Sequence, residues 1–227
     1  MNEMKAQTAL WNYYQNRNRE SFDQNYARLG YILKQIPHKS RVLNIGIGNA
    51  WLENNIPCIQ GTAFSLDPDA ESVQQRNSDA PESAKVGVCS EIPWEEDFFD
   101  VVVVSEVLEH IPEGELSQSL NEIQRVLKPG GIILGTVPAE ENLEDNKVLC
   151  PHCNEVFHKW GHEKSFSEVT LQAALAEPFR SLSIKRRCFP AWRLLNTSGK
   201  ILACVKMFKM LFGLYGSGEQ FFFRAHA

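Results

Sequence analysis

The chain has 227 residues, of which 43% are hydrophobic and 22% are charged, a composition typical of one globular domain rather than a disordered chain. Its 23 basic and 28 acidic residues give a formal net charge of -5, which argues against a broad face for nucleic acid. The N-terminal stretch lacks the pattern of a secretion signal, and no run reaches the ~18 apolar residues of a membrane span. We therefore expect a cytoplasmic protein.

Predicted helices and strands alternate along the chain. Residues 1–37 carry apolar side chains at helical intervals until Pro37 stops the pattern, which predicts two helices that form an N-terminal lid. Helices are also predicted at 69–77, 115–127 and 167–176, the last opened by Ser167 and Thr170. Continuous apolar runs predict strands buried on both faces, at 41–48, 61–67, 84–88, 97–106, 130–137, 181–189 and 218–227. This alternation predicts an α/β fold, a doubly wound seven-stranded sheet in one domain, 1–227.

Two stretches depart from the alternation. Residues 139–164 form a polar segment that contains two close cysteines and three histidines and is longer than an ordinary connection, which indicates a functional loop or a small insertion. Residues 191–215 predict an extra helix before the last strand. Within 199–215, Lys200, Lys206 and Lys209 interrupt apolar residues, so this helix is expected to cover the substrate, to contact a second copy, or to touch a membrane or lipid.

The first predicted strand ends in a glycine-bearing turn. The run from Val42 to Ala50 reads VLNIGIGNA, and glycines suit a turn where a ligand approaches the backbone closely. The second predicted strand ends at Asp67, where a carboxylate can accept hydrogen bonds from ribose hydroxyls. Together these features predict a cofactor that contains a nucleoside. A nicotinamide-dependent reductase is the plain alternative, although the turn lacks the third glycine of dinucleotide-binding proteins.

Five segments in consecutive order, over roughly residues 41–138, resemble the class I S-adenosylmethionine-dependent methyltransferase family, and within it the methyltransferase type 11-like members. The segments are VLNIGIG, LDPDAESV, VGVCSEIPW, FFDVVVVSEVLEHIP and LKPGGIILGTVP. The resemblance implies a Rossmann-like sheet of the class I methyltransferase type, S-adenosylmethionine (SAM) as cofactor, and methyl transfer. By position it also implies the cofactor-binding residues, which are Asn44, Gly46, Gly48, Asp67, Pro68, Val88, Cys89 and Ser105.

Three positions depart from the family pattern. The family's third glycine is Ala50 here, its acid at the start of the turn is Asn44, and its acid beside the adenine amino group is Val88. Asn44 can still accept a hydrogen bond from the methionine ammonium, although without the help of a negative charge. A catalytically degenerate module that binds SAM, or a partner, without turnover is therefore the main alternative to an enzyme.

The polar segment carries a Cys-x-x-Cys pair followed by two histidines. Thiolates and imidazoles are the usual ligands of tetrahedral zinc, so Cys150, Cys153, His158 and His162 are the predicted ligands of a structural zinc ion. Reduced thiols without metal, and a thioredoxin-like redox pair, stay open as alternatives. In the resemblance to the methyltransferases, His162 borders the substrate pocket.

Methyl transfer from a sulfonium is an in-line displacement, in which the protein aligns the acceptor and removes its proton. A hydroxyl acceptor benefits from a base near neutral pH, and His110 and His162 are the predicted candidates, with Glu106 as a positioning group. His110 has a plain alternative as a structural tie in its loop. We predict methylation, with oxygen as the favoured target, of a small-molecule, sugar or lipid-linked acceptor, and no nucleic acid partner.

Overall fold

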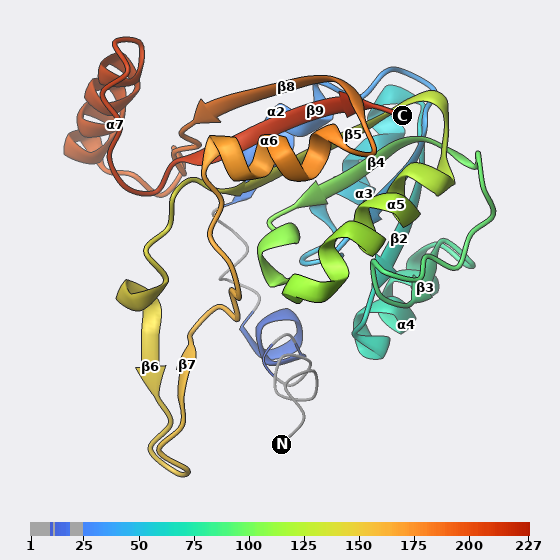
Figure 1. Cartoon of the computed structure of the whole chain (residues 1–227), viewed down its shortest axis with the longest axis horizontal. Helices are drawn as coiled ribbons and strands as arrows, with labels where there is room; N and C mark the ends of the chain where they lie inside the picture. Colours follow the sequence, from blue (N-terminus) through green and yellow to red (C-terminus); the bar gives the residue numbers. More distant parts are fainter. Residues whose placement is uncertain (1–9, 11, 19–24) are drawn as a thin grey trace.

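The computed structural model describes residues 10, 12–18 and 25–227, and a seven-stranded sheet lies at its centre (Figure 1). The strands are ordered β3-β2-β1-β4-β5-β9-β8. Strands β1 to β5 run parallel, and β9 is antiparallel to both neighbours, β5 and β8. All seven predicted strands are confirmed, with the bounds β1 (Arg41–Ile45), β2 (Thr62–Asp67), β3 (Ala84–Val86), β4 (Phe99–Ser105), β5 (Leu127–Pro138), β8 (Arg180–Arg187) and β9 (Gln220–His226).

Helices cover both faces of this sheet, which explains the continuous apolar runs. In β4, Val101 and Val103 pack toward one core, and Val102 and Val104 pack toward the other, because successive side chains of a strand point to opposite faces. The predicted helices 69–77, 115–127 and 167–176 are confirmed. The α-helices of the described residues are α2 (Tyr26–Leu33), α3 (Trp51–Asn55), α4 (Ala70–Asp79), α5 (Leu116–Val126), α6 (Glu168–Ala176) and α7 (Thr197–Met210).

The predicted N-terminal lid lies only partly within the described residues. Its described part consists of a single π-helical turn, η1 (Tyr13–Arg17), and of α2. At the start of α6, the predicted capping box is present: the Ser167 hydroxyl accepts from the Thr170 amide, and the Thr170 hydroxyl accepts from the Ser167 amide. No helix within the described ranges has both the length and the apolar character needed to cross a bilayer.

The polar segment after β5 contains a small hairpin that the sequence predicts only as a loop or insertion. Strands β6 (Lys147–Leu149) and β7 (Val156–His158) pair antiparallel and extend away from the main sheet (Figure 1). The two cysteines lie in the turn, whereas His158 is paired with Lys147 at the other end of the hairpin. The hairpin therefore separates the cysteines from His158 along its length.

One edge of the sheet gathers the segments that bear the predicted site. The strand order reverses between β1 and β4, the kind of switch point where open α/β sheets bind ligands. At the same edge β5 ends with Pro138 opposite Gln220, and β8 ends with Arg187, also opposite Gln220. We call this edge, at the carboxyl ends of β1, β4 and β5, the carboxyl edge. The polar segment and α7 both begin from it.

Candidate active site

The glycine turn after β1 lies at the switch point. Gly46 and Gly48 have φ values of 86° and 56°, which side chains rarely adopt, and a Cβ on Gly46 would lie 3.3 Å from Val107 Cγ2. Ala50 also has a positive φ, 58°, where it precedes α3. The alanine in the position of the third glycine therefore adopts a left-handed backbone at a modest conformational cost, rather than only needing more space. The two glycines leave the backbone of the turn open to close approach.

Asp67 braces this turn from the end of β2. Its carboxylate accepts hydrogen bonds from the amide of Ile47 at 2.8 Å and from the amide of Asp69 at 2.9 Å, and the residue is fully buried. These contacts hold the carboxylate at the carboxyl end of β2, beside the glycine turn. The position agrees with the ribose-binding role that the family resemblance implies.

Asn44 is held by a carboxylate that the sequence analysis did not identify. The amide nitrogen of Asn44 donates to the Gly46 carbonyl at 2.9 Å and to Glu53 Oε1 at 2.8 Å, and the Ser65 hydroxyl donates to the same oxygen at 2.9 Å. Burial raises the pKa of Glu53, although these hydrogen bonds oppose the shift. The donor groups of Asn44 thus support the turn. Nothing in its sequence context distinguishes Glu53 from other acidic residues of a short helix.

The remaining predicted cofactor residues fall into two environments. Val88 is 44% exposed, whereas Cys89 is buried and burial raises its pKa to about 12, so its thiol is neutral and forms part of an apolar wall. After β4, Ser105 Oγ accepts a hydrogen bond from Arg28 Nε at 3.1 Å, and Glu106 lies 3.5 Å from Arg28 Nη1. Arg28, from α2, is a buried partner that the sequence analysis missed. Pro68, also predicted, follows Asp67 directly at the end of β2.

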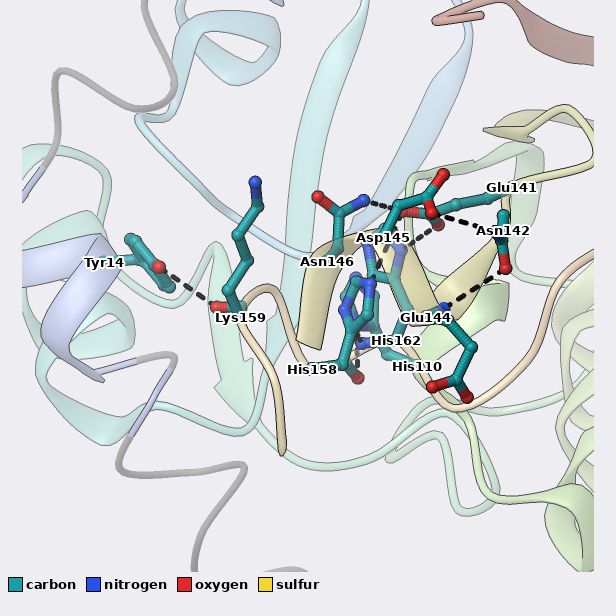
Figure 2. A network of polar contacts seen from close by, with 11 residues as sticks. Tyr14, His110, Glu141, Asn142, Glu144, Asp145, Asn146, His158, Lys159 and His162 are labelled. Atoms are coloured by element: carbon teal, nitrogen blue, oxygen red, sulfur yellow. Dashed lines mark hydrogen bonds and ion pairs between the residues drawn. The ribbon is translucent and has the colours of Figure 1, made fainter. Parts of the chain in front are cut away.

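Three histidines and one glutamate form a cluster at the carboxyl edge (Figure 2). The ring centroids of His110 and His162 are 4.7 Å apart, and those of His158 and His162 are 4.6 Å apart and stacked. Glu141, from the segment after β5, hydrogen-bonds Nδ1 of His162 through Oε2. His110 and His162, the two predicted base candidates, are thus brought together, and Glu141 is a partner that the sequence did not indicate.

The hydrogen bonds of this cluster fix which ring nitrogens carry protons. The carboxylate of Glu141 can only accept, so Nδ1 of His162 carries a proton, and in the neutral ring Nε2 holds the lone pair. Nδ1 of His158 accepts from the His162 amide at 3.1 Å, which places the His158 proton on Nε2, 3.5 Å from Glu141 Oε1. Burial opposes ionisation of Glu141, but the hydrogen bond and charge of His162, and the Asn146 amide, lower its pKa overall. Glu141 is therefore a carboxylate that orients His162.

His110 is held in its neutral form. Its Nδ1 lies 3.0 Å from the Gly161 carbonyl, which can only accept, so in the neutral ring Nε2 is the acceptor nitrogen. Burial, and then the charge of His162, lower the pKa of His110 to about 3. The neighbouring Glu109 is buried, and burial followed by the charge of Glu106 raises its pKa well above the usual value. The site thus keeps an uncharged imidazole across the physiological pH range.

This low pKa predicts a pH-dependent stability. An unfolded chain binds a proton at His110 below about pH 6.5, whereas the folded chain does not until about pH 3, so stability is lost as the pH falls below 6.5. Between pH 7 and pH 5, the free energy of unfolding measured in urea should fall by up to about 2 kcal/mol more for wild type than for His110→Asn. Wild type and His110→Asn share the titratable groups that face this ring, which are those of His162, His158, Glu141 and Glu109. Exposed His38→Asn is the control, and parallel wild-type and His110→Asn curves would refute the assignment.

The structure does not assemble the predicted zinc ligands. Within the described residues, the groups whose ligand atoms lie within 4.8 Å of one another are Glu109 with His110 and His162, and Glu141 with His158 and His162. Neither group includes Cys150 or Cys153, which lie in the hairpin turn. The half-buried Cys150 has a lowered pKa, because the amides of Cys153 and His152 and the Cys153 thiol hydrogen-bond it. Both groups lie in the histidine cluster and not around the cysteines, so the predicted set of two cysteines and two histidines is not gathered around one point in the described residues.

The described part of the N-terminal segment contacts both sides of the site. The Asn12 side chain donates to Asp69 Oδ1 at 3.1 Å, at the start of α4. The Tyr14 hydroxyl donates to the Lys159 carbonyl at 3.0 Å (Figure 2). The Tyr14 ring lies 5.1 Å from that of Trp160. The segment therefore links the cofactor-side helix to the polar segment that carries the histidines, as a lid would.

Comparisons with known proteins agree with this geometry. A family model described as a methyltransferase domain matches residues 43–135. A tRNA (carboxymethyluridine(34)-5-O)-methyltransferase of Arabidopsis thaliana is 30% identical over 127 residues, which cover 55% of this chain and 30% of that protein. The chain spans less than half the length of the curated relatives it matches, 30% and 41%.

Solved structures share the fold. A SAM-dependent methyltransferase of Thermotoga maritima superposes with a TM-score of 0.66 at 16% identity, covering 96% of this chain and 98% of that one. One from Archaeoglobus fulgidus gives a TM-score of 0.62 at 17% identity, covering 96% and 99%. At this level of identity the likeness establishes the fold alone.

Proposed function

We propose that this chain, whose residues 43–135 match a methyltransferase-domain family, is a class I S-adenosylmethionine-dependent methyltransferase that transfers the methyl group of SAM to a hydroxyl oxygen of a small-molecule, sugar or lipid-linked acceptor. The observation that carries this proposal is the Glu141–His162 hydrogen bond at the carboxyl edge. A carboxylate that holds one imidazole nitrogen leaves the other to take a proton from a reacting hydroxyl.

The residues around the switch point fit the cofactor. A Cβ on Gly46 would crowd Val107, so the turn requires glycine there, and the Asp67 carboxylate beside the turn would accept hydrogen bonds from the ribose hydroxyls. Val88 and Cys89 would provide an apolar wall for the adenine. SAM supplies an electrophilic methyl group on a sulfonium, so the protein's own task is to bind, align and deprotonate the acceptor.

His162 is the base in this proposal. As the acceptor oxygen forms its bond to the methyl carbon, the bond from carbon to sulfur breaks, and the hydroxyl proton passes to Nε2 of His162. The carboxylate of Glu141 stabilises the resulting imidazolium through Nδ1. His110, uncharged and next to His162, orients the acceptor, and Glu106, paired with Arg28, fixes the loop after β4.

Charge favours a small acceptor over a nucleic acid. The Arabidopsis relative is named for an oxygen of a tRNA nucleoside, which supports oxygen as the target atom. Binding tRNA, however, relies on neutralising phosphates with basic residues, and this chain has a formal net charge of -5. We therefore propose an acceptor without a long phosphate backbone. We assign no step of the reaction to zinc, since the four predicted ligands are not gathered around one point in the described part of the chain.

The test is methyl transfer from SAM to a panel of acceptors, measured as release of S-adenosylhomocysteine. The panel contains phenols, free sugars, lipid-linked sugars, matched amines and, as a separate arm, bulk tRNA. We expect turnover with hydroxyl-bearing small molecules or lipid-linked sugars. Turnover with tRNA or amines alone would contradict the acceptor class. Binding of SAM without turnover on any acceptor would favour the degenerate SAM-binding module.

A further inference from the structure

Helix α7 stands apart from the layers of the fold (Figure 1). It lies between β8 and β9, and none of its residues is buried. Ile201, Val205 and Phe208 are 60%, 44% and 61% exposed, and Phe212, just beyond the helix, is 68% exposed. Contiguous apolar surface of this kind on a folded chain marks an interaction site.

Four of the exposed apolar side chains form one stripe, which consists of Ile201, Val205, Phe208 and Phe212. Positions i, i+4 and i+7 share a helix face, so Ile201, Val205 and Phe208 are aligned, and the Phe208 and Phe212 rings lie 5.2 Å apart. The opposite face turns inward through Lys206, whose ammonium is 3.0 Å from Glu219 Oε1. An ordinary surface helix buries its apolar face and exposes its polar face. Here the apolar stripe faces solvent, whereas the less exposed residues of α7 include Ala203, Lys206 and Met210.

Positive charge borders the stripe on both sides. Lys200 directly precedes Ile201 and Lys209 directly follows Phe208. Because each residue of an α-helix turns by about 100°, the two lysines lie on opposite sides of the stripe. Long lysine side chains in such positions reach headgroup anions while their neighbours enter the apolar boundary. Residues 191–218 contain four basic residues and no acidic residue, which leaves 19 basic and 28 acidic residues elsewhere. The segment is thus a positive, apolar projection from an acidic protein.

This distribution of charge indicates which kind of partner binds the stripe. A symmetric contact between two copies would place Lys200 and Lys209 of one helix against those of the other, with like charges facing. An anionic bilayer surface instead satisfies both the apolar stripe and the lysines. We propose that α7 docks the protein on anionic bilayer surfaces.

Docking through α7 would bring the proposed active site to the bilayer. The helix begins from the carboxyl edge, since β8 ends and β9 begins there, and the histidine cluster lies at the same edge. An acceptor with its lipid anchored in the membrane would meet the site without leaving the bilayer. This second step rests on the proposed function, whereas bilayer binding itself does not.

The experiment is cosedimentation of the full chain with vesicles of phosphatidylcholine, with or without one third phosphatidylglycerol. Wild type should bind the anionic vesicles at least about tenfold more tightly than the neutral ones. Phe208→Ser combined with Phe212→Ser should weaken binding by about tenfold or more. Lys200→Glu combined with Lys209→Glu should abolish the preference for anionic lipid. Val169→Ser, on α6 and 77% exposed, is the matched control and should change nothing.

Three results would overturn the proposal. They are no pelleting of wild type with anionic vesicles, equal pelleting of the Phe208/Phe212 variant, and a wild-type dimer in sedimentation equilibrium that this variant dissociates. The last would assign the stripe to a second copy. Urea unfolding verifies that the variants stay folded. The assay uses neither SAM nor an acceptor, so its failure is distinct from failure of the proposed function.

Discussion

His162→Asn is expected to lower kcat by about 10²- to 10⁴-fold, the usual contribution of a positioned general base, while the affinity for SAM stays unchanged. The imidazole is lost from the centre of the cluster, where its Nδ1 is held by Glu141 and its ring contacts His110 and His158. Asparagine keeps a polar contact to Glu141 but cannot accept the acceptor's proton near neutral pH. Steady-state release of S-adenosylhomocysteine, with the acceptor found in the panel, measures the effect.

His152→Asn is the matched control for this variant. His152 is exposed in the hairpin turn, away from the cluster, so kcat should remain at the wild-type value. Wild-type kcat in His162→Asn would remove the base assignment. A parallel fall in SAM affinity would instead indicate that the variant disturbs the cofactor side, and the free energy of unfolding would then decide whether the site had lost its fold.

Asp67→Ala is expected to weaken SAM binding by about 10- to 100-fold, the loss associated with hydrogen bonds to a charged group. The carboxylate is the predicted partner of the ribose and also holds the turn through the Ile47 amide. Asp67→Asn keeps an acceptor oxygen for that amide and separates the two roles. Asp79→Ala, at the exposed end of α4, controls for loss of a negative charge. Unchanged affinity in Asp67→Ala would contradict the ribose assignment.

The parts of the fold that bury many apolar residues were predictable from the sequence. The central strands β1, β4 and β5 contain continuous apolar runs because helices cover both faces, as the alternating valines of β4 illustrate. The hairpin of β6 and β7 was not predictable as strands, since each is three residues long and most of its side chains are exposed. Its pairing is set by contacts that leave no periodic pattern in the sequence.

The site residues that lie at the ends of strands were predictable from the sequence. The site residues whose partners depend on tertiary packing were not. Gly46 and Asp67 lie where the motif order placed them, at the ends of β1 and β2. The histidines after Cys150 have the spacing of zinc ligands, but the hairpin carries the cysteines away and turns His162 toward Glu141. Sequence spacing alone cannot tell which side of a hairpin a ring faces. Arg28 and Glu53 likewise acquire their roles only through burial.

Calorimetric titration of the folded wild-type protein with SAM and with S-adenosylhomocysteine tests whether the switch point binds SAM. If the switch point binds SAM, we expect one site per chain with a micromolar-range dissociation constant, about 8 kcal/mol of binding free energy, for either ligand. No detectable heat with either ligand, from protein whose urea unfolding is cooperative, would contradict it.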